Sequence, residues 1–245
     1  MKTAIVTGAS GAIGSAIVEK FVKNGYFVIA QYNSNKTAID NVKESLEKDG
    51  FSGVVFPFKA DFTKIEDVNA LYDYAITNFK KVDVLINNAG VDVYKLITET
   101  EEDEYDKVFN VNVKSAYFLS SLCLKQMIER KFGKIVFISS IWGKVGGSME
   151  TAYSASKSAL IGLTKALAKE VAPSKINVNC ICPGVIDSPM NDIFDEEEKR
   201  ELIERTPLKS MGKVDDVSEL AYFLCSQQAS FITGEAITID GGFTL

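Results

Sequence analysis

The chain has 245 residues, a hydrophobic content of 46% and a formal net charge of −6. This length and composition predict one globular domain over residues 1–245, and the acidic balance argues against general nucleic-acid binding. The sequence contains no histidine, which excludes histidine-based triads and histidine-ligated metal sites and leaves acid–base chemistry to tyrosine, lysine or carboxylates.

The N-terminus and the apolar runs bear on where the protein works. The start, MKTAIVTGAS, enters a short strand directly and lacks the apolar region of a signal peptide, and no apolar run has the length of a membrane helix. We therefore expect a cytoplasmic protein. Four cysteines do not make a disulfide framework, and Cys180 and Cys182 share one face of a strand, so we expect them to pack in the core and predict no metal site.

The first elements along the chain are a strand, a glycine-rich turn and a helix. Thr3–Val6 is short and apolar, Gly8, Gly11 and Gly14 follow, and apolar residues then recur at helical spacing. Glycines at such a turn let the backbone approach a phosphate, and the helix N-terminus attracts the anion. The arrangement predicts a dinucleotide site at the start of the chain.

The residues after the second strand bear on the choice of cofactor. This strand covers Tyr26–Tyr32, and an acidic residue at its end would bind the 2′-hydroxyl of NAD. No acid occurs before Asp40; instead Asn33, Ser34 and Lys36 are placed to meet a 2′-phosphate. We therefore expect NADPH rather than NADH.

Strands and helices alternate through the rest of the chain. Helices are expected at 36–48, 65–79, 195–205 and 215–226, and strands at 53–59, 82–87, 134–140, 175–182 and 236–239. One long, largely buried helix, Glu101–Arg130, is expected to carry Asn112 near its middle. This alternation predicts an α/β fold with a parallel sheet and helices on both faces.

The stretch Ser140–Lys157 carries the predicted chemistry. Residues from Thr151 onward have helical periodicity, so Tyr153 and Lys157 are neighbours on one face. A nearby ammonium is expected to lower the tyrosine pKa toward the working range. Ser140, at the end of a strand, is placed to hold a carbonyl oxygen. These groups are what the reduction of a ketone needs.

The motifs TGASGAIG, Asp61, NNAG, Asn112, Ser140, YSASK and PG-x-I-x-S together resemble the short-chain dehydrogenase/reductase family over the whole chain. Within the family the segments ASFITGEAITIDGG and PLKSMGKVDDV are similar to 3-oxoacyl-[acyl-carrier-protein] reductases. The resemblance implies a single-domain Rossmann fold with a seven-stranded parallel sheet, a nicotinamide cofactor and a tetramer, in which helices 101–130 and 151–171 pair across one interface and the last strand lies at another.

The resemblance also implies roles for individual residues. Tyr153 donates the proton, Lys157 lowers its pKa and binds the nicotinamide ribose, Ser140 holds the substrate oxygen, and Asn112 anchors a water that relays protons. Asp61 meets the adenine, and Ile186 the carboxamide. The full set of cofactor contacts implied is Gly8, Ser10, Gly11, Ile13, Gly14, Asn33, Ser34, Asp61, Asn88, Ala89, Gly90, Tyr153, Lys157, Pro183, Gly184, Ile186 and Ser188.

This sequence departs from the family pattern at the glycine turn and after the PG motif. Gly11 stands where NADP-dependent reductases often carry arginine, and Ala12 where a glycine is usual. Ser188 replaces the usual threonine and keeps its hydroxyl. The missing arginine removes one expected contact to the 2′-phosphate.

Several substrates fit this chemistry. The first expectation is 3-oxoacyl thioesters on acyl carrier protein, with Arg130, Lys131, Lys134 and Lys175 as the docking cluster and a lid at Phe194–Arg205. The segment SSIWGKVGGSME resembles reductases that act on a 5-aminopentanone modification of elongation factor P, where Glu150 and Glu102 would favour the amine. A small-alcohol or sugar dehydrogenase and a non-catalytic NADP sensor are further alternatives.

Overall fold

The computed structural model describes residues 1–189 and 195–245. Its strands are β1 (Lys2–Val6), β2 (Tyr26–Tyr32), β3 (Val55–Lys59), β4 (Val84–Asn87), β5 (Gly133–Ile138), β6 (Ile176–Pro183) and β7 (Ala236–Ile239). Its α-helices are α1 (Ala12–Lys23), α2 (Lys36–Lys48), α3 (Ile65–Phe79), α4 (Glu102–Phe109), α5 (Ser115–Arg130), α6 (Trp142–Val145), α7 (Thr151–Val171), α8 (Glu196–Arg205) and α9 (Val214–Cys225).

The strands form one seven-stranded sheet in the order β3-β2-β1-β4-β5-β6-β7, and every pairing is parallel. The predicted Rossmann fold, with its parallel sheet and helices on both faces, is therefore confirmed. The strand order reverses between β1 and β4. In open α/β sheets a ligand binds outside the carboxyl ends of the strands at such a point.

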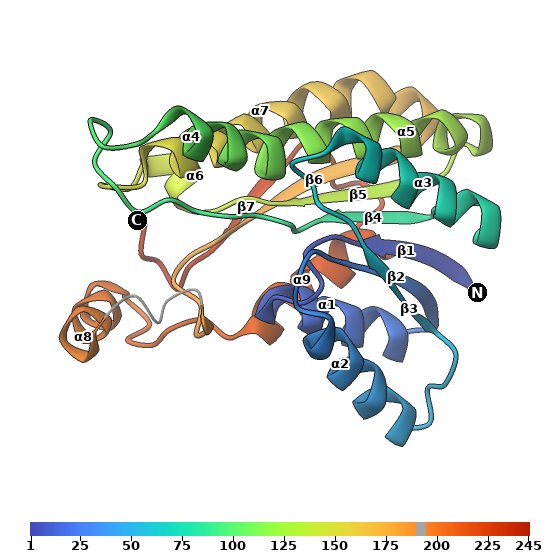
Figure 1. Cartoon of the computed structure of the whole chain (residues 1–245), viewed down its shortest axis with the longest axis horizontal. Coiled ribbons are helices and arrows are strands. Elements are labelled where there is room, and N and C mark those ends of the chain that lie inside the picture. The colour runs from blue at the N-terminus through green and yellow to red at the C-terminus, as the bar shows by residue number, and fades with distance from the viewer. Residues whose placement is uncertain (190–194) are drawn as a thin grey trace.

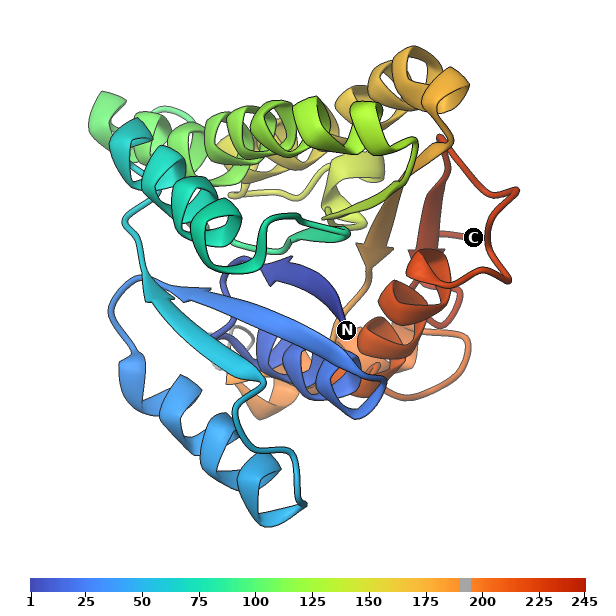
Figure 2. The same ribbon diagram turned by 90° about the vertical axis from the view of Figure 1, so that its right-hand side faces the viewer.

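Helices cover both faces of the sheet (Figure 1). α1, α2 and α9 lie on one face, and α3, α5 and α7 on the other; Figure 2 shows the sheet between these layers. Successive strand residues point to opposite faces, so Val6 packs in the core under α1 whereas Ile5 packs in the core under α3 and α5. The near-continuous burial of β5 and β6 is typical of a parallel sheet covered on both sides.

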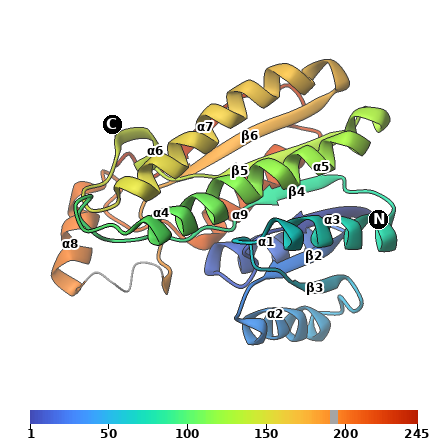
Figure 3. The same cartoon turned by 45° about the horizontal axis from the view of Figure 1, so that its top comes forward.

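The expected helix Glu101–Arg130 is interrupted. A π-helical turn, Asn110–Lys114, separates α4 from α5, although the three segments follow one another closely (Figure 3). The helix is also less buried than predicted, since Phe118 is 42% exposed. A π-turn shifts the side-chain register by one residue, which explains why regular helical spacing misjudged the buried face.

The predicted docking cluster lies at the wrong end of the molecule. Lys131, Lys134 and Lys175 line a cavity at the amino ends of β5 and β6, opposite the carboxyl ends where the ligand crevice lies. Arg130 is held by Asp83 at 2.8 Å. Because these residues precede parallel strands, they cannot border the site, and the prediction that they receive a carrier protein there is wrong.

Several smaller predictions can also be checked. Cys180 and Cys182 are fully buried in the core under α7, as expected. No helix within the described ranges is long and apolar enough to cross a membrane. The expected lid began at Phe194, which lies outside the described residues, whereas α8, its larger part, forms a regular helix capped by Asp195.

Candidate active site

One pocket of about 670 Å³ opens at the carboxyl ends of the strands. It runs from the glycine turn and the end of β2, past the loops after β4 and β5, to the start of α7 and the loop after β6. Every residue predicted to contact the cofactor lines it, except Ser34 and Asp61. The fold thus brings motifs from the whole chain to one cavity, at the topological switch point.

The glycine turn leaves no room for side chains at two positions. Gly8 has φ +62, where side chains are disfavoured, and a Cβ there would lie 2.7 Å from the Ala89 Cα. A Cβ on Gly14 would lie 2.2 Å from the carbonyl oxygen of Gly8. The N-terminus of α1 follows, without a side-chain cap and without an acidic residue in its first turn. Its open N–H groups and its dipole fit the pyrophosphate of a dinucleotide.

Thr7 and Asn88 hold this turn against β4. The Thr7 hydroxyl accepts hydrogen bonds from the backbone N–H groups of Asn88 and Ala89, both at 2.9 Å. The Asn88 amide donates to the carbonyl oxygens of Thr7 at 2.9 Å and Gly8 at 3.1 Å. The side chain of Asn88 therefore positions the glycine turn. The predicted contact of this segment with the adenosine ribose stays a prediction.

Gln31, which the sequence analysis did not single out, ties the same turn to β2 and β3. Its side-chain oxygen accepts from the Gly8 N–H, and its nitrogen donates to the Ala60 carbonyl, both at 2.8 Å. Only 3% of this side chain is exposed. A buried amide near the end of a strand that borders a glycine turn is the signal that was available in the sequence.

The end of the pocket near β2 contains Asn33 and Asn35 but not Ser34. Lys36 forms an ion pair with Asp40 at 2.7 Å, so this lysine is not free for a phosphate as the sequence suggested. The Asp61 carboxylate accepts hydrogen bonds from Thr63, while its neighbours Ala60 and Phe62 line the cavity.

Tyr153, Lys157 and Ser140 come together as predicted. Tyr153 and Lys157 lie one turn apart on α7, with the ammonium 5.3 Å from the centre of the phenol ring. The Ser140 hydroxyl hydrogen-bonds the phenol. The Lys157 ammonium donates to the carbonyl of Ile138 at 2.9 Å, and the Ser139 hydroxyl donates to the carbonyl of Lys157 at 2.8 Å. These bonds fix the start of α7 against the end of β5.

The pKa of the tyrosine differs from the sequence-based expectation. Burial raises the pKa of Tyr153 above its ordinary value, the negative charges of Asp92 and Glu150 raise it further, and only the hydrogen bond from Ser140 opposes them. Burial also lowers the pKa of Lys157 to about 8, so near neutral pH its charge is less firmly held. The prediction that Lys157 lowers the tyrosine pKa is therefore not met; instead the phenol is kept protonated.

Asn112 lies in the π-turn behind the pocket and is 1% exposed. Its side-chain oxygen accepts from the Val91 N–H at 2.8 Å, and its nitrogen donates to the Val91 carbonyl at 2.9 Å and to the Ser156 hydroxyl at 3.0 Å. Both N–H bonds of the amide are thus engaged in joining the loop after β4 to α7. The predicted water relay at Asn112 stays a prediction that does not use these N–H groups.

Two carboxyl groups border the tyrosine. Glu150, just before α7, is 9% exposed and hydrogen-bonds Asp92, in the loop after β4; both line the pocket. The alternative of an amine-bearing substrate predicted a role for Glu150, but its partner is Asp92, and Glu102 is an exposed residue of α4. The pairing depends on how two distant segments meet, which local sequence patterns do not reveal.

The comparisons with known proteins agree with this geometry. The family model for short chain dehydrogenases matches residues 2–199. The 3-oxoacyl-[acyl-carrier-protein] reductase FabG of Thermotoga maritima is 34% identical over 244 residues, covering 100% of this chain and 98% of that protein. The enzyme of the same name from Staphylococcus aureus is 34% identical over 98% of this chain and 97% of its own length. A short-chain dehydrogenase/reductase mutant from Serratia marcescens has a similar structure, with a TM-score of 0.92 and 31% identity over 100% of this chain and 98% of that chain. The chain belongs to the short-chain dehydrogenase/reductase family and is an oxidoreductase that acts on a keto or CH–OH group.

Proposed function

We propose that this protein reduces a ketone to a secondary alcohol with NADPH. The observation that carries the proposal is the meeting of Tyr153, Ser140 and Lys157 in the pocket that also contains the glycine turn. Tyr153 donates the proton, and the other two groups position the substrate oxygen and the cofactor ribose. A non-catalytic sensor would not need this acid beside a carbonyl-binding hydroxyl.

The protonation states suit reduction. A bound nicotinamide supplies hydride to the carbonyl carbon, after which the oxygen needs a proton. The Ser140 hydroxyl and the Tyr153 phenol converge on one point and stabilise the negative charge that develops on that oxygen. The raised pKa of Tyr153 keeps the proton on the phenol until the alkoxide forms, because an alkoxide is a much stronger base.

The substrate with the broadest support is a 3-oxoacyl thioester on acyl carrier protein. The support comes from the full-length similarity to enzymes named 3-oxoacyl-[acyl-carrier-protein] reductase. Since the basic cluster lies at the other end of the sheet, a carrier would have to approach the rim between α4 and α8. The second candidate is a ketone on modified elongation factor P, because the segment resembling those reductases supplies Ser140, Trp142 and Glu150 to the pocket wall.

NADPH is proposed over NADH because the pocket wall near the end of β2 contains Gln31, Asn33 and Asn35 and, within the described part of the chain, no carboxylate. An acid there would repel a 2′-phosphate. Comparing kcat/KM for the two cofactors tests this choice; an equal or higher value with NADH overturns it.

We also propose a homotetramer. Tyr105, Tyr117 and Phe118 are 45%, 52% and 42% exposed on the outer side of α4 and α5, and Phe231, before β7, is fully exposed. Exposed aromatic groups at the two expected interfaces support pairing of copies there. Sedimentation equilibrium of the purified chain tests the state.

A panel of NADPH oxidation assays tests the proposed function. Acetoacetyl thioesters of coenzyme A and of acyl carrier protein, a set of small ketones, and aminopentanone-modified elongation factor P are compared by kcat/KM. Highest turnover of the carrier-bound thioester supports the first substrate, and highest turnover of the modified factor supports the second. No reduction of any ketone overturns the proposed function.

A further inference from the structure

The substrate end of the pocket contains an acidic pair without a basic partner. Glu150 precedes α7 and is nine-tenths buried, and its carboxyl group hydrogen-bonds that of Asp92. Lys95, in the loop after β4, pairs with Glu104 instead, at 2.6 Å. No ion pair within 1–189 or 195–245 joins Asp92 or Glu150 to a basic side chain.

Burying such a pair is costly unless something offsets its charge. Two carboxyl groups in contact cannot both ionise, and burial with the charge of Asp92 raises the pKa of Glu150 to about 8. At neutral pH the pair therefore holds one shared proton and one negative charge, inside a pocket and facing no cation of its own. Buried charges in proteins are normally paired, so this one points to a cationic partner that arrives with the ligand.

The pair also acts on the reacting tyrosine. Asp92 and Glu150 both raise the pKa of Tyr153, and Asp92 acts on Lys157 as well, so the acidic pair and the reacting groups are electrostatic neighbours. A positive charge beside the pair would oppose the first effect and make the phenol a stronger acid when the substrate is in place. This coupling is available only to a substrate that carries a cation.

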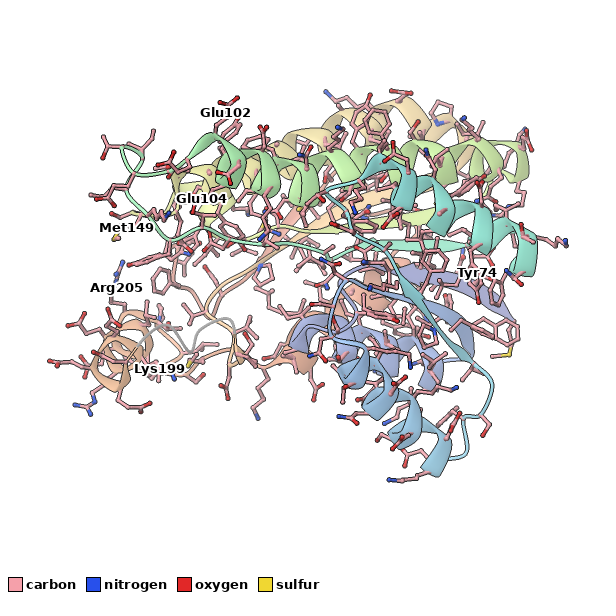
Figure 4. All side chains as sticks on the ribbon, viewed as in Figure 1. Tyr74, Glu102, Glu104, Met149, Lys199 and Arg205 are labelled. Carbon is pink, nitrogen blue, oxygen red and sulfur yellow. The ribbon has the colours of Figure 1, made fainter. Side chains whose placement is uncertain are left out.

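The rim of the pocket has the same sign. α4 contains Glu102, Asp103, Glu104 and Asp106 against Lys107 alone, and α8 contains five glutamates against three basic residues. Lys107 and Leu202 of these two helices reach the pocket wall. Figure 4 shows Glu102 and Glu104 on α4 at the same end of the molecule as Lys199 and Arg205 on α8. A negative rim attracts cations and repels an acidic carrier protein.

We propose that Asp92 and Glu150 form a subsite for a positively charged group of the substrate, so that this reductase selects ketones that carry an ammonium a few bonds from the carbonyl. The inference rests on the proposed ketone reduction and specifies its substrate class. The ammonium lies against the two carboxyl groups, while the carbonyl oxygen of the same molecule is held by Ser140 and Tyr153.

A pair of isosteric ketones tests the subsite. 5-(Dimethylamino)pentan-2-one is cationic at neutral pH, and 6-methylheptan-2-one has nearly the same shape without the charge. We expect kcat/KM with NADPH to be at least about 10-fold higher for the cationic ketone, equivalent to about 1.4 kcal/mol. Glu150→Gln and Asp92→Asn should each bring this ratio toward one. Glu170→Gln, which removes a charge from the exposed far end of α7, should leave the ratio as it is.

A parent ratio near one, or a ratio that both pocket variants leave unchanged, overturns the subsite. Inhibition of acetoacetyl thioester reduction by each ketone gives the same comparison as binding constants, so the test holds even if small ketones turn over slowly. Reduction of the thioester together with equal binding of the two ketones overturns the subsite but not ketone reduction. Failure of every ketone and thioester would overturn the proposed function itself.

Discussion

Gly14 is the position in the glycine turn where a side chain costs most. In Gly14→Ala the new Cβ would lie 2.2 Å from the Gly8 carbonyl oxygen, 2.8 Å from the Ala9 Cα and 2.9 Å from the Asn88 amide nitrogen. Ordinary van der Waals contact begins near 3.4 Å, so the turn has to move by about 1 Å away from α1. The backbone N–H groups that face the pyrophosphate move with it.

The loss follows from the bonds that this movement breaks. Hydrogen bonds to a charged group are worth about 1.5–3 kcal/mol each, and losing one or two of them raises the dissociation constant for NADPH at least about 10-fold. Gly11→Ala is the matched control, because its Cβ would meet only the Gly8 carbonyl oxygen, at 3.5 Å, and its backbone is extended with φ −78.

Fluorescence titration of NADPH measures both variants, and thermal unfolding checks that each is folded. We expect weak binding by Gly14→Ala and nearly parental binding by Gly11→Ala. Parental affinity in a folded Gly14→Ala variant, or equal losses in both, would refute the assignment of this turn to the cofactor phosphates.

Three further predictions concern charged residues. Lys157→Ala should lower kcat and also weaken NADPH binding, because the ammonium serves both proton transfer and the ribose; a loss in only one of these measurements would contradict the dual role. Glu150 has its pKa raised from 4.5 to about 8, so the folded state binds more protons than the unfolded state over that range, and the unfolding free energy of the parent should fall as pH rises from about 5 to 8, by up to about 1.4 kcal/mol per pH unit. Urea unfolding of Glu150→Gln should lack this component; identical pH profiles would contradict the shift. Arg130→Glu should cost about 3–5 kcal/mol of stability, because it leaves the buried carboxylate of Asp83 without its partner, and urea unfolding that shows no loss would contradict that pairing.

Local patterns in the sequence were enough for the sheet and for most of the site. The strand, glycine turn and helix at Thr3–Lys23 follow from short-range spacing, and so does the tyrosine–lysine pair, since a helix places i and i+4 together whatever surrounds it. Their gathering at one pocket follows from parallel strands, whose carboxyl ends meet at one edge.

Features that depend on contacts between distant segments were not accessible in this way. The hydrogen bond between Asp92 and Glu150 joins the loop after β4 to the start of α7, and no local pattern encodes it. The pKa of Tyr153 depends on the burial of the phenol and on the same two carboxyl groups, so spacing to Lys157 alone predicted the wrong direction. The π-turn at Asn112 changes the helical register by one residue, which a period of 3.6 cannot show.

The placement of the basic cluster is a different kind of error. Lys131 and Lys134 lie at the beginning of β5, and Lys175 directly precedes β6. Residues that precede parallel strands lie at the edge opposite the ligand crevice, so strand direction alone excluded them from the site.

The proton-donor role of Tyr153 is the central claim, and Tyr153→Phe tests it most directly. The substitution removes only the hydroxyl of a side chain that is 8% exposed, so the fold should be retained. The measurement is single-turnover oxidation of bound NADPH by the best ketone of the panel, beside a titration of NADPH affinity. The account predicts a rate lower by at least about 10²–10⁴-fold, the contribution of general acid catalysis, with cofactor affinity changed little. A near-parental rate in the folded variant would contradict the proposed mechanism.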